Sequence, residues 1–169
     1  QKLSDDVIEM EKMLNEYLQF SSSQSVEETE TFDISELLKT TIQKYEKEEI
    51  ITEIIDRVYF NGRKNLIRRC FNNLINNAIK YSNNVNIKLN KSANNITIII
   101  DDDGPGIPEN ERENVFKPFY KIDKSRGDSK SSVGLGLSIA SDIIQSHGGN
   151  IKLESSTSNG LRVKIFLPF

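Results

Sequence analysis

The sequence predicts an α+β sandwich of two layers, in which helices cover one face of a mixed β-sheet. Apolar residues recur with helical spacing in some segments and alternate with polar residues, or form short runs, in others. From residue 32 onward the expected order is strand, helix, two strands, helix, two strands, a long polar stretch, helix and two strands. Strand pairs and helices are therefore grouped separately, which is typical of the α+β class.

A separate helix precedes this domain. In residues 1–20, apolar side chains recur with alternating steps of four and three residues, at Leu3, Val7, Met10, Leu14 and Tyr17. This spacing predicts a partial coiled-coil seam, although an ordinary amphipathic helix fits a stretch of this length equally well. Residues 21–31, SSSQSVEETET, are polar and have no period, so we expect a linker there and a main domain over 32–169.

The first half of the main domain alternates between the two patterns. Phe32 begins a short strand, and an aspartate or serine cap then starts a helix with apolar residues on one face. The segments ITEIID and RVYFNG predict two strands, because β-branched and aromatic residues dominate them. Residues 64–82 predict the next helix.

The second half contains two predicted hairpins. The segment KSANN joins the strands VNIKLN and NITIIID, and Asn159-Gly160 lies between NIKLESS and LRVKIFLPF. Residues 102–133 are rich in glycine, proline and charge, and their length predicts a lid or binding loop. GLGLSIASDIIQSHGG then predicts a helix that ends at two glycines.

Composition excludes several classes of function. Lys plus Arg is 22 and Asp plus Glu is 25, giving −3, which argues against a nucleic-acid binder that neutralises phosphates. One histidine and one cysteine supply neither a zinc site nor a catalytic triad. The single cysteine, the lack of a signal peptide and the lack of a long apolar run predict a cytoplasmic setting. The chain starts at Gln1, so we expect a piece of a longer protein with any membrane anchor outside it.

The predicted helix 64–82 has two distinct faces. Its core face collects Ile67, Phe71, Leu74, Ile75 and Ala78, and its polar face collects Asn73, Asn77, Lys80 and Tyr81. A solvated face is the ordinary interpretation. However, Lys, Glu or Gln would favour an exposed helix more than two asparagines do. Amide oxygens suit a magnesium ion that keeps waters and phosphate oxygens, and a lysine suits phosphate.

The segment DDDGPGI follows a strand that reads as buried. Pro105 occupies a ligand position of a calcium-binding EF-hand loop, so that interpretation fails. A plain turn with solvated acids remains possible. A purine pocket is the third interpretation: one carboxylate accepts from an exocyclic amine, Gly104 and Gly106 let a flat ring lie close to the backbone, and Ile107 supplies an apolar floor.

The segment SSVGLGLSIA opens a helix at Gly134. It matches neither a Walker loop nor a dinucleotide-binding fingerprint, because no Gly-Lys follows and Ile139 stands where a small residue belongs. Gly134 and Gly136 would expose backbone N–H groups to an anion at the helix start. Glycine is also common at helix starts without such a function.

The order of these motifs resembles the ATP-binding domain of sensor histidine kinases of the EnvZ-like class, within the GHKL superfamily that has the Bergerat fold. NLINNAIKYS is similar to the N box, DDGPGI to the first glycine box, VFKPFYKID to the F box and GLGL to the second glycine box. NGLRVKIFLP is similar to the closing strand region. The resemblance covers residues 32–169, and residues 1–20 are similar to the end of a dimerisation and phosphoacceptor domain.

The resemblance implies ATP and Mg²⁺ as cofactors and assigns roles to individual residues. Asn77 would hold Mg²⁺ with Asn73 beside it, Lys80 would meet phosphate, and Tyr81 would stack near adenine or ribose. Asp102 would accept from the adenine amine, with Asp101 and Asp103 solvated or structural. Phe116 and Phe119 would pack the lid, and Lys121 would reach the γ-phosphate. The residues of the second glycine box would surround the phosphates, namely Gly134, Leu135, Gly136 and Leu137.

The resemblance also implies a reaction. Where ATPases of the superfamily have a glutamate base, Asn73 is uncharged, so hydrolysis should be slow. The γ-phosphoryl would pass to a histidine on a dimerisation domain outside this chain, and then to a response regulator. The full-length protein would be a homodimer anchored in the bacterial inner membrane, with His147 structural. A degenerate, non-catalytic nucleotide-binding module and an anti-sigma-type serine kinase are the alternatives.

Overall fold

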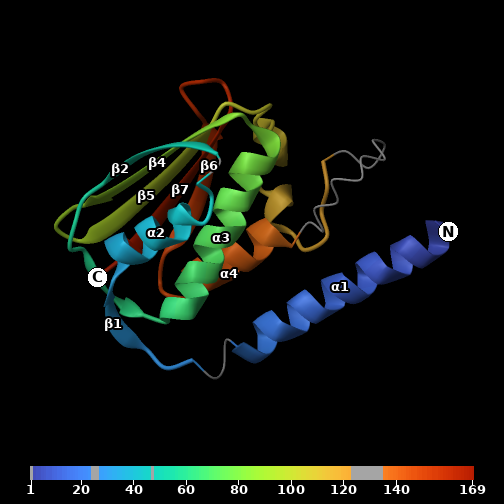
Figure 1. Ribbon diagram of the computed structural model, residues 1–169, viewed down its shortest axis with the longest axis horizontal. Coiled ribbons are helices and arrows are strands. Elements are labelled where there is room, and N and C mark those ends of the chain that lie inside the picture. Colours follow the sequence, from blue (N-terminus) through green and yellow to red (C-terminus); the bar gives the residue numbers. More distant parts are fainter. Residues whose placement is uncertain (1, 24–26, 47, 123–134) are drawn as a thin grey trace.

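The structure, a computed structural model, describes residues 2–23, 27–46, 48–122 and 135–169. A five-stranded mixed sheet forms one layer of the main domain, and the helices that follow β1 pack on one of its faces (Figure 1). This arrangement confirms the predicted α+β sandwich. The long helix α1 (Lys2–Ser23) runs alongside the domain and is set apart from the sheet (Figure 1).

The main sheet has the strand order β2-β4-β5-β7-β6. Its strands are β2 (Glu49–Ile54), β4 (Asn84–Lys91), β5 (Asn95–Asp102), β6 (Asn150–Ser155) and β7 (Leu161–Pro168). β2 is parallel to β4, and the other neighbouring pairs are antiparallel. Both predicted hairpins, β4–β5 and β6–β7, are present. β5 lies at the centre, between β4 and β7, and its last residue, Asp102, is paired with Val85 of β4.

A second, small sheet joins β1 (Glu30–Asp33) to β3 (Tyr59–Gly62) in antiparallel register. Phe32 lies opposite Phe60, and their rings meet edge to face with centroids 6.0 Å apart. The sequence predicted both strands but not that they pair with each other outside the main sheet. This pairing places the start of α2 and the start of α3 at the same end of the domain.

Three helices of the described ranges cover the inner face of the sheet: α2 (Ile34–Gln43), α3 (Lys64–Tyr81) and α4 (Gly136–Ser146) (Figure 1). The predicted aspartate cap of α2 is confirmed, because Asp33 Oδ1 accepts a hydrogen bond from the N–H of Glu36 at 3.1 Å. α3 and α4 run antiparallel, since the start of α3 meets the end of α4 through the Arg63–His147 contact.

The core lies between these helices and the sheet. Every residue predicted for the core face of α3 is buried, namely Ile67, Phe71, Leu74, Ile75 and Ala78. They face the inward, alternating residues of the central strands, which are Val85, Ile87, Leu89, Ile96, Ile98, Ile100, Val163, Ile165 and Leu167. The helical and strand periods in the sequence thus predicted both surfaces of the core.

Helix α1 extends to Ser23, and β1 begins at Glu30, so both reach into the predicted linker. The division of the chain into two units remains a prediction. After β5, short 3₁₀ turns occupy Glu109–Glu111 and Asn114–Phe116, and residues 123–133 of the predicted lid lie outside the described residues. In the described ranges, no helix is both long enough and apolar enough to cross a membrane.

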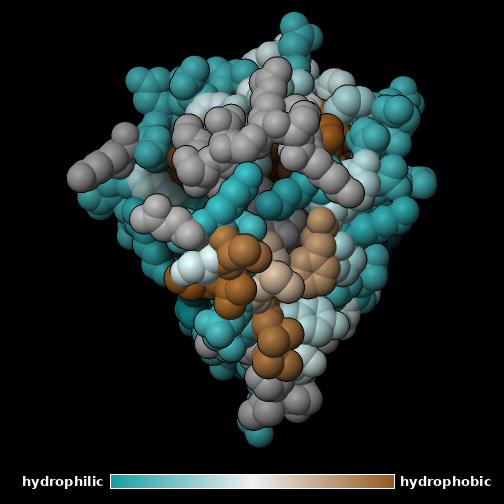
Figure 2. Space-filling model, turned by 90° about the vertical axis from the view of Figure 1, so that its right-hand side faces the viewer, coloured by the Kyte–Doolittle hydropathy of each residue, from teal (hydrophilic) through white to brown (hydrophobic). Residues whose placement is uncertain are grey.

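The apolar side chains of α1 are largely exposed. They are Leu3, Val7, Ile8, Met10, Leu14, Tyr17 and Leu18, with Leu3 82% exposed. Figure 2 shows apolar residues gathered in the lower half of the face toward which α1 projects. Met13 is the α1 residue that packs against the core among those the structure describes.

Candidate functional site

Asp102, the last residue of β5, points toward the helices and is only 7% exposed. Its Oδ1 accepts two backbone hydrogen bonds, from the N–H of Gly104 at 2.9 Å and from that of Leu161 at 3.0 Å. Both bonds end on the same oxygen. Within the described part of the chain, Oδ2 is therefore the oxygen that remains available to accept a hydrogen bond from a ligand.

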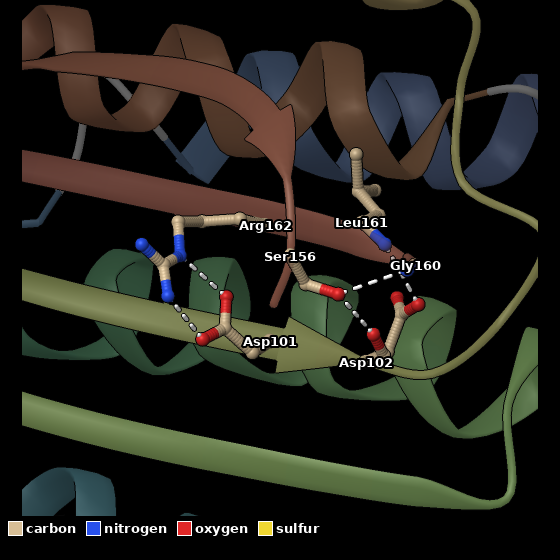
Figure 3. A network of polar contacts seen from close by, with 6 residues as sticks. All are labelled: Asp101, Asp102, Ser156, Gly160, Leu161 and Arg162. Carbon is tan, nitrogen blue, oxygen red and sulfur yellow. Dashed lines mark hydrogen bonds and ion pairs between the residues drawn. The ribbon is translucent and has the colours of Figure 1, made fainter. Parts of the chain in front are cut away.

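The turn between β6 and β7 closes over Asp102 (Figure 3). The hydroxyl of Ser156 donates to the carbonyl oxygen of Asp102 at 2.7 Å and accepts from the N–H of Gly160 at 2.9 Å. A Cβ atom on Gly160 would lie 2.1 Å from that same carbonyl oxygen, so a larger residue cannot stand there. Sequence reasoning predicted a turn at this place but not its contact with the buried carboxylate.

The two aspartates beside Asp102 have structural roles. Asp101 forms a two-pronged ion pair with Arg162 across β5 and β7, with both N–O distances 2.7 Å (Figure 3). Asp103 accepts from the backbone N–H groups of Asn83 and Asn84 at 2.9 and 3.0 Å, which fixes the turn between α3 and β4. Of these three aspartates, Asp102 is the one whose carboxylate faces the helices.

The environment of Asp102 raises its pKa above the ordinary value, mainly because burial penalises the charged form. The N–H groups of Leu161 and Gly104 act in the opposite direction, since they stabilise the carboxylate. The negative charges of Asp103 and Asp101 add to the rise. Asp102 therefore takes up a proton more readily than an exposed aspartate does.

Glycine occupies positions 104 and 106 of this turn for two different physical reasons. A Cβ atom on Gly104 would lie 2.5 Å from the carbonyl oxygen of Tyr81, so this glycine lets the turn contact the end of α3. Gly106 has φ +70°, which favours glycine directly. Ile107 packs against the core, and its carbonyl oxygen accepts from Arg112 Nε at 3.1 Å. Arg112 also donates to Ser155 Oγ, at 2.9 Å, which ties the glycine turn to the end of β6.

The amide face of α3 meets the start of α4. A Cβ atom on Gly136 would lie 3.5 Å from Asn77 Nδ2 and 4.0 Å from Asn73 Cβ, which is ordinary contact distance. The Nδ2 atom of Asn73 is buried and has no hydrogen-bond partner among the described residues. A buried amide without a partner costs free energy, so Asn73 Nδ2 is a candidate for contact with a ligand.

The other site residues predicted on α3 and around the start of α4 differ in burial. Leu135 is buried beside the first turn of α4, Leu137 packs against the core, and Gly134 lies outside the described residues. Tyr81 is 50% exposed, with Lys80 Nζ 5.4 Å from the centre of its ring.

Two predicted site residues, Phe119 and Lys121, belong to the described part of the lid region. Phe119 is 55% exposed and has φ +66°, in the left-handed region that a phenylalanine adopts rarely. Lys121 Nζ lies 3.8 Å from Glu9 Oε1, so this lysine faces α1. A role for Lys121 at phosphate therefore requires the side chain to leave Glu9.

Comparison with known proteins gives the family of the chain. Residues 62–169 match the family described as "Histidine kinase-, DNA gyrase B-, and HSP90-like ATPase". The chain belongs to this family. The matched region contains α3, the Asp102 turn and α4, so every part of the candidate site falls within the ATPase match. The chain is thus an ATP-binding catalytic domain of the sensor histidine kinase type.

Curated relatives and solved structures are sensor kinases. The chain is 32% identical to Sensor histidine kinase GtrS of Pseudomonas aeruginosa over 171 residues, 99% of this chain and 35% of that protein. It is 39% identical to Sensor histidine kinase CpxA of Escherichia coli K12 over 108 residues, 63% of this chain and 24% of that protein. The chain therefore spans about a quarter to a third of these relatives. A solved structure of the mycobacterial sensor histidine kinase MprB superposes with a TM-score of 0.73 at 25% identity, over 83% of this chain and 97% of that one.

His147 of this ATPase domain has the structural role that the sequence predicted. Its Nε2 accepts from the backbone N–H of Arg63 at 3.0 Å, and its Nδ1 donates to the carbonyl oxygen of Ile143 at 2.7 Å. Burial lowers its pKa, so the neutral ring is favoured. Both nitrogens are engaged, and the ring packs beside Phe60 with centroids 5.9 Å apart.

Proposed function

We propose that this chain binds ATP with Mg²⁺ and presents the γ-phosphoryl group to a histidine on the dimerisation domain of the same kinase, for onward transfer to a response regulator. One observation carries the proposal: Asn73 and Asn77 lie against Gly136, and the buried Nδ2 of Asn73 lacks a partner among the described residues. The polar groups of this place are arranged for a ligand and not for the fold.

The adenine would lie against the turn after β5. Oδ2 of Asp102 would accept from the exocyclic amine, because the two backbone bonds already occupy Oδ1. Gly104 and Gly106 would keep the backbone close to the ring, Ile107 would supply apolar contact, and the exposed ring of Tyr81 would stack at the edge.

The phosphates and the metal would lie between α3 and the start of α4. The residues present fit a magnesium ion, since Asn77 offers a hard, neutral amide oxygen beside Asn73 and Mg²⁺ keeps waters and phosphate oxygens as its other ligands. Bound there, Mg²⁺ would neutralise phosphate charge. Lys80, Lys121 and Phe119 would approach from the sides, and Gly134, Leu135, Gly136 and Leu137 would surround the phosphates.

Asn73 decides the type of reaction. An amide has no basic lone pair that could take a proton from water, so hydrolysis by this site should be slow. Catalysis would then consist of holding the nucleotide in line with an external nucleophile. We infer that residues 1–20 belong to the dimerisation domain, because the exposed apolar residues of α1 suit a second copy of the chain. The full-length protein would then be a membrane-anchored homodimer with this domain in the cytoplasm.

A phosphotransfer assay in trans tests the proposal. The chain would be mixed with a separately produced phosphoacceptor domain, labelled ATP and Mg²⁺. We expect label on the acceptor histidine with the native chain and at least a tenfold loss with Asn77→Ala, because the amide oxygen is removed. Asn76→Ala is the matched control, since Asn76 is an exposed neighbour of the same type on α3. Tight ATP binding without any transfer would support the alternative, a non-catalytic nucleotide-binding module.

A further inference from the structure

We propose that Ser156 is a positioning residue for purine recognition. Its hydroxyl holds the β6–β7 turn against Asp102, so that the carboxylate accepts from an amino group at C6 of a purine and disfavours a keto group there. The inference rests on the proposed function, because it assumes that Asp102 meets the adenine.

The hydroxyl of Ser156 both donates and accepts a hydrogen bond within the fold. It donates to the carbonyl oxygen of Asp102 at 2.7 Å and accepts from the N–H of Gly160 at 2.9 Å. Ser156 is only 6% exposed, so water has little access to replace either bond. The side chain thus connects the backbone of the residue that reads the purine to the residue that ends the turn (Figure 3).

The hydrogen bond from the Gly160 N–H to the Ser156 hydroxyl controls the direction of the Asp102 carboxylate. Once Gly160 is fixed, the N–H of the next residue, Leu161, points to Oδ1 of Asp102 at 3.0 Å. Together with the N–H of Gly104 it holds Oδ1, and the rotation of the carboxylate is restricted. Oδ2 then projects toward the ligand as an acceptor. Without the Ser156 hydroxyl, the Gly160 N–H loses its acceptor and the turn can move away from the carboxylate.

The same contact keeps Asp102 an acceptor. Burial favours a protonated carboxyl, and the N–H of Leu161 opposes this by stabilising the charge. The negative charges of Asp103 and Asp101 also raise the pKa of Asp102, but Asp101 is paired with Arg162 and Asp103 is held by the N–H groups of Asn83 and Asn84. A protonated Asp102 could donate to a keto oxygen, whereas the charged form repels one. Ser156 therefore favours an amino purine over a keto purine.

Binding of two nucleotides tests the proposal. The native chain, Ser156→Ala and the matched control Ser158→Ala, an exposed serine of the same turn, would be titrated with ATP and with inosine triphosphate, which carries a keto group at C6. We expect the native chain to prefer ATP. In Ser156→Ala this preference should fall by about threefold to tenfold, the effect of one neutral hydrogen bond. The control should keep the native preference, and an equal weakening of both nucleotides would overturn the proposal.

Two further variants separate a loss of nucleotide preference from a loss of folding, and the role of Ser156 from that of Asp102. Ser156→Cys has nearly the same size but a weaker hydrogen-bonding group, so a folded protein with an intermediate preference is expected even if Ser156→Ala unfolds. A native preference in Ser156→Cys would also overturn the proposal. Asp102→Asn should abolish the preference for ATP over inosine triphosphate. If the preference persists in Asp102→Asn, the assignment of Asp102 to the adenine is wrong. If Asp102→Asn loses the preference but Ser156→Ala keeps it, only the role of Ser156 is wrong.

Discussion

The two ends of the α3–α4 helix pair differ in how their polar groups are satisfied. At one end, Arg63 donates to His147 at 3.0 Å, and the carboxylate of Glu27 accepts from the N–H groups of Asn65 and Leu66 at 2.6 and 3.1 Å. At the other end, the buried Nδ2 of Asn73 has no partner in the described part of the chain. We refer to these as the tied end and the open end.

The difference separates stability from binding. Polar groups at the tied end are paired within the chain, so their loss should lower the free energy of unfolding without altering the ligand site. The polar groups at the open end contact the ligand in our proposal, so their loss should leave the fold intact. Three substitutions test this separation, from the largest expected effect to the smallest.

His147→Ala should have the largest effect. The substitution leaves the Arg63 N–H and the Ile143 carbonyl without their partners and removes the ring that packs against Phe60. We expect the free energy of unfolding to fall by about 3 kcal/mol, with ATP affinity of the folded fraction within twofold of native. Urea denaturation and calorimetric titration measure the two quantities. Gln145→Ala, an exposed residue of the same helix, should change neither.

Glu27→Gln should have a smaller effect of the same kind. The carboxylate of Glu27 accepts from the first N–H groups of α3, where a negative charge is favoured by the helix dipole. Loss of the charge should lower the free energy of unfolding by about 1 kcal/mol. Glu28→Gln is the control, because Glu28 is an exposed neighbour. Equal effects of the two substitutions would show that the cap contributes nothing.

Asn73→Ala should have the smallest effect on stability, and of opposite sign. It removes a buried amide without a partner and introduces a better helix former, so the free energy of unfolding should stay constant or rise by about 0.5 kcal/mol. Affinity for ATP with Mg²⁺ should fall at least about fivefold, by loss of one polar contact. Asn76→Ala should gain similar stability without any loss of affinity. A clear loss of stability in Asn73→Ala would place this residue in the fold.

Features that depend on local pattern could be predicted from the sequence. The two faces of α3 followed from the helical period. The end of an apolar strand indicated one carboxylate of three in a pocket, and the family resemblance chose Asp102 among them. From the sequence, Gly104 was explained by the close approach of a purine ring. The structure gives a reason within the fold, because a side chain at this position would collide with the Tyr81 carbonyl oxygen.

Contacts between distant residues could not be predicted. Ser156 and Asp102 are 54 residues apart, and Glu27 and Leu66 are 39 apart. A single serine or glutamate in a polar stretch carries no sign of the partner that folding brings to it. The β1–β3 pairing was missed for the same reason. Asn159-Gly160 was the one local signal near the Asp102 contact, and it indicated a turn without its neighbour.

The contact between Leu161 and Asp102 joins residues 59 positions apart, and β7 follows the other strands that the structure describes. During synthesis, the aspartate therefore leaves the ribosome well before the backbone that will orient it. A nascent chain that stops before β7 can already hold the α3 sequence and the glycine turn, yet it lacks the backbone that orients Asp102 in the purine pocket we propose. Competence to take up nucleotide should thus arise only when β7 docks.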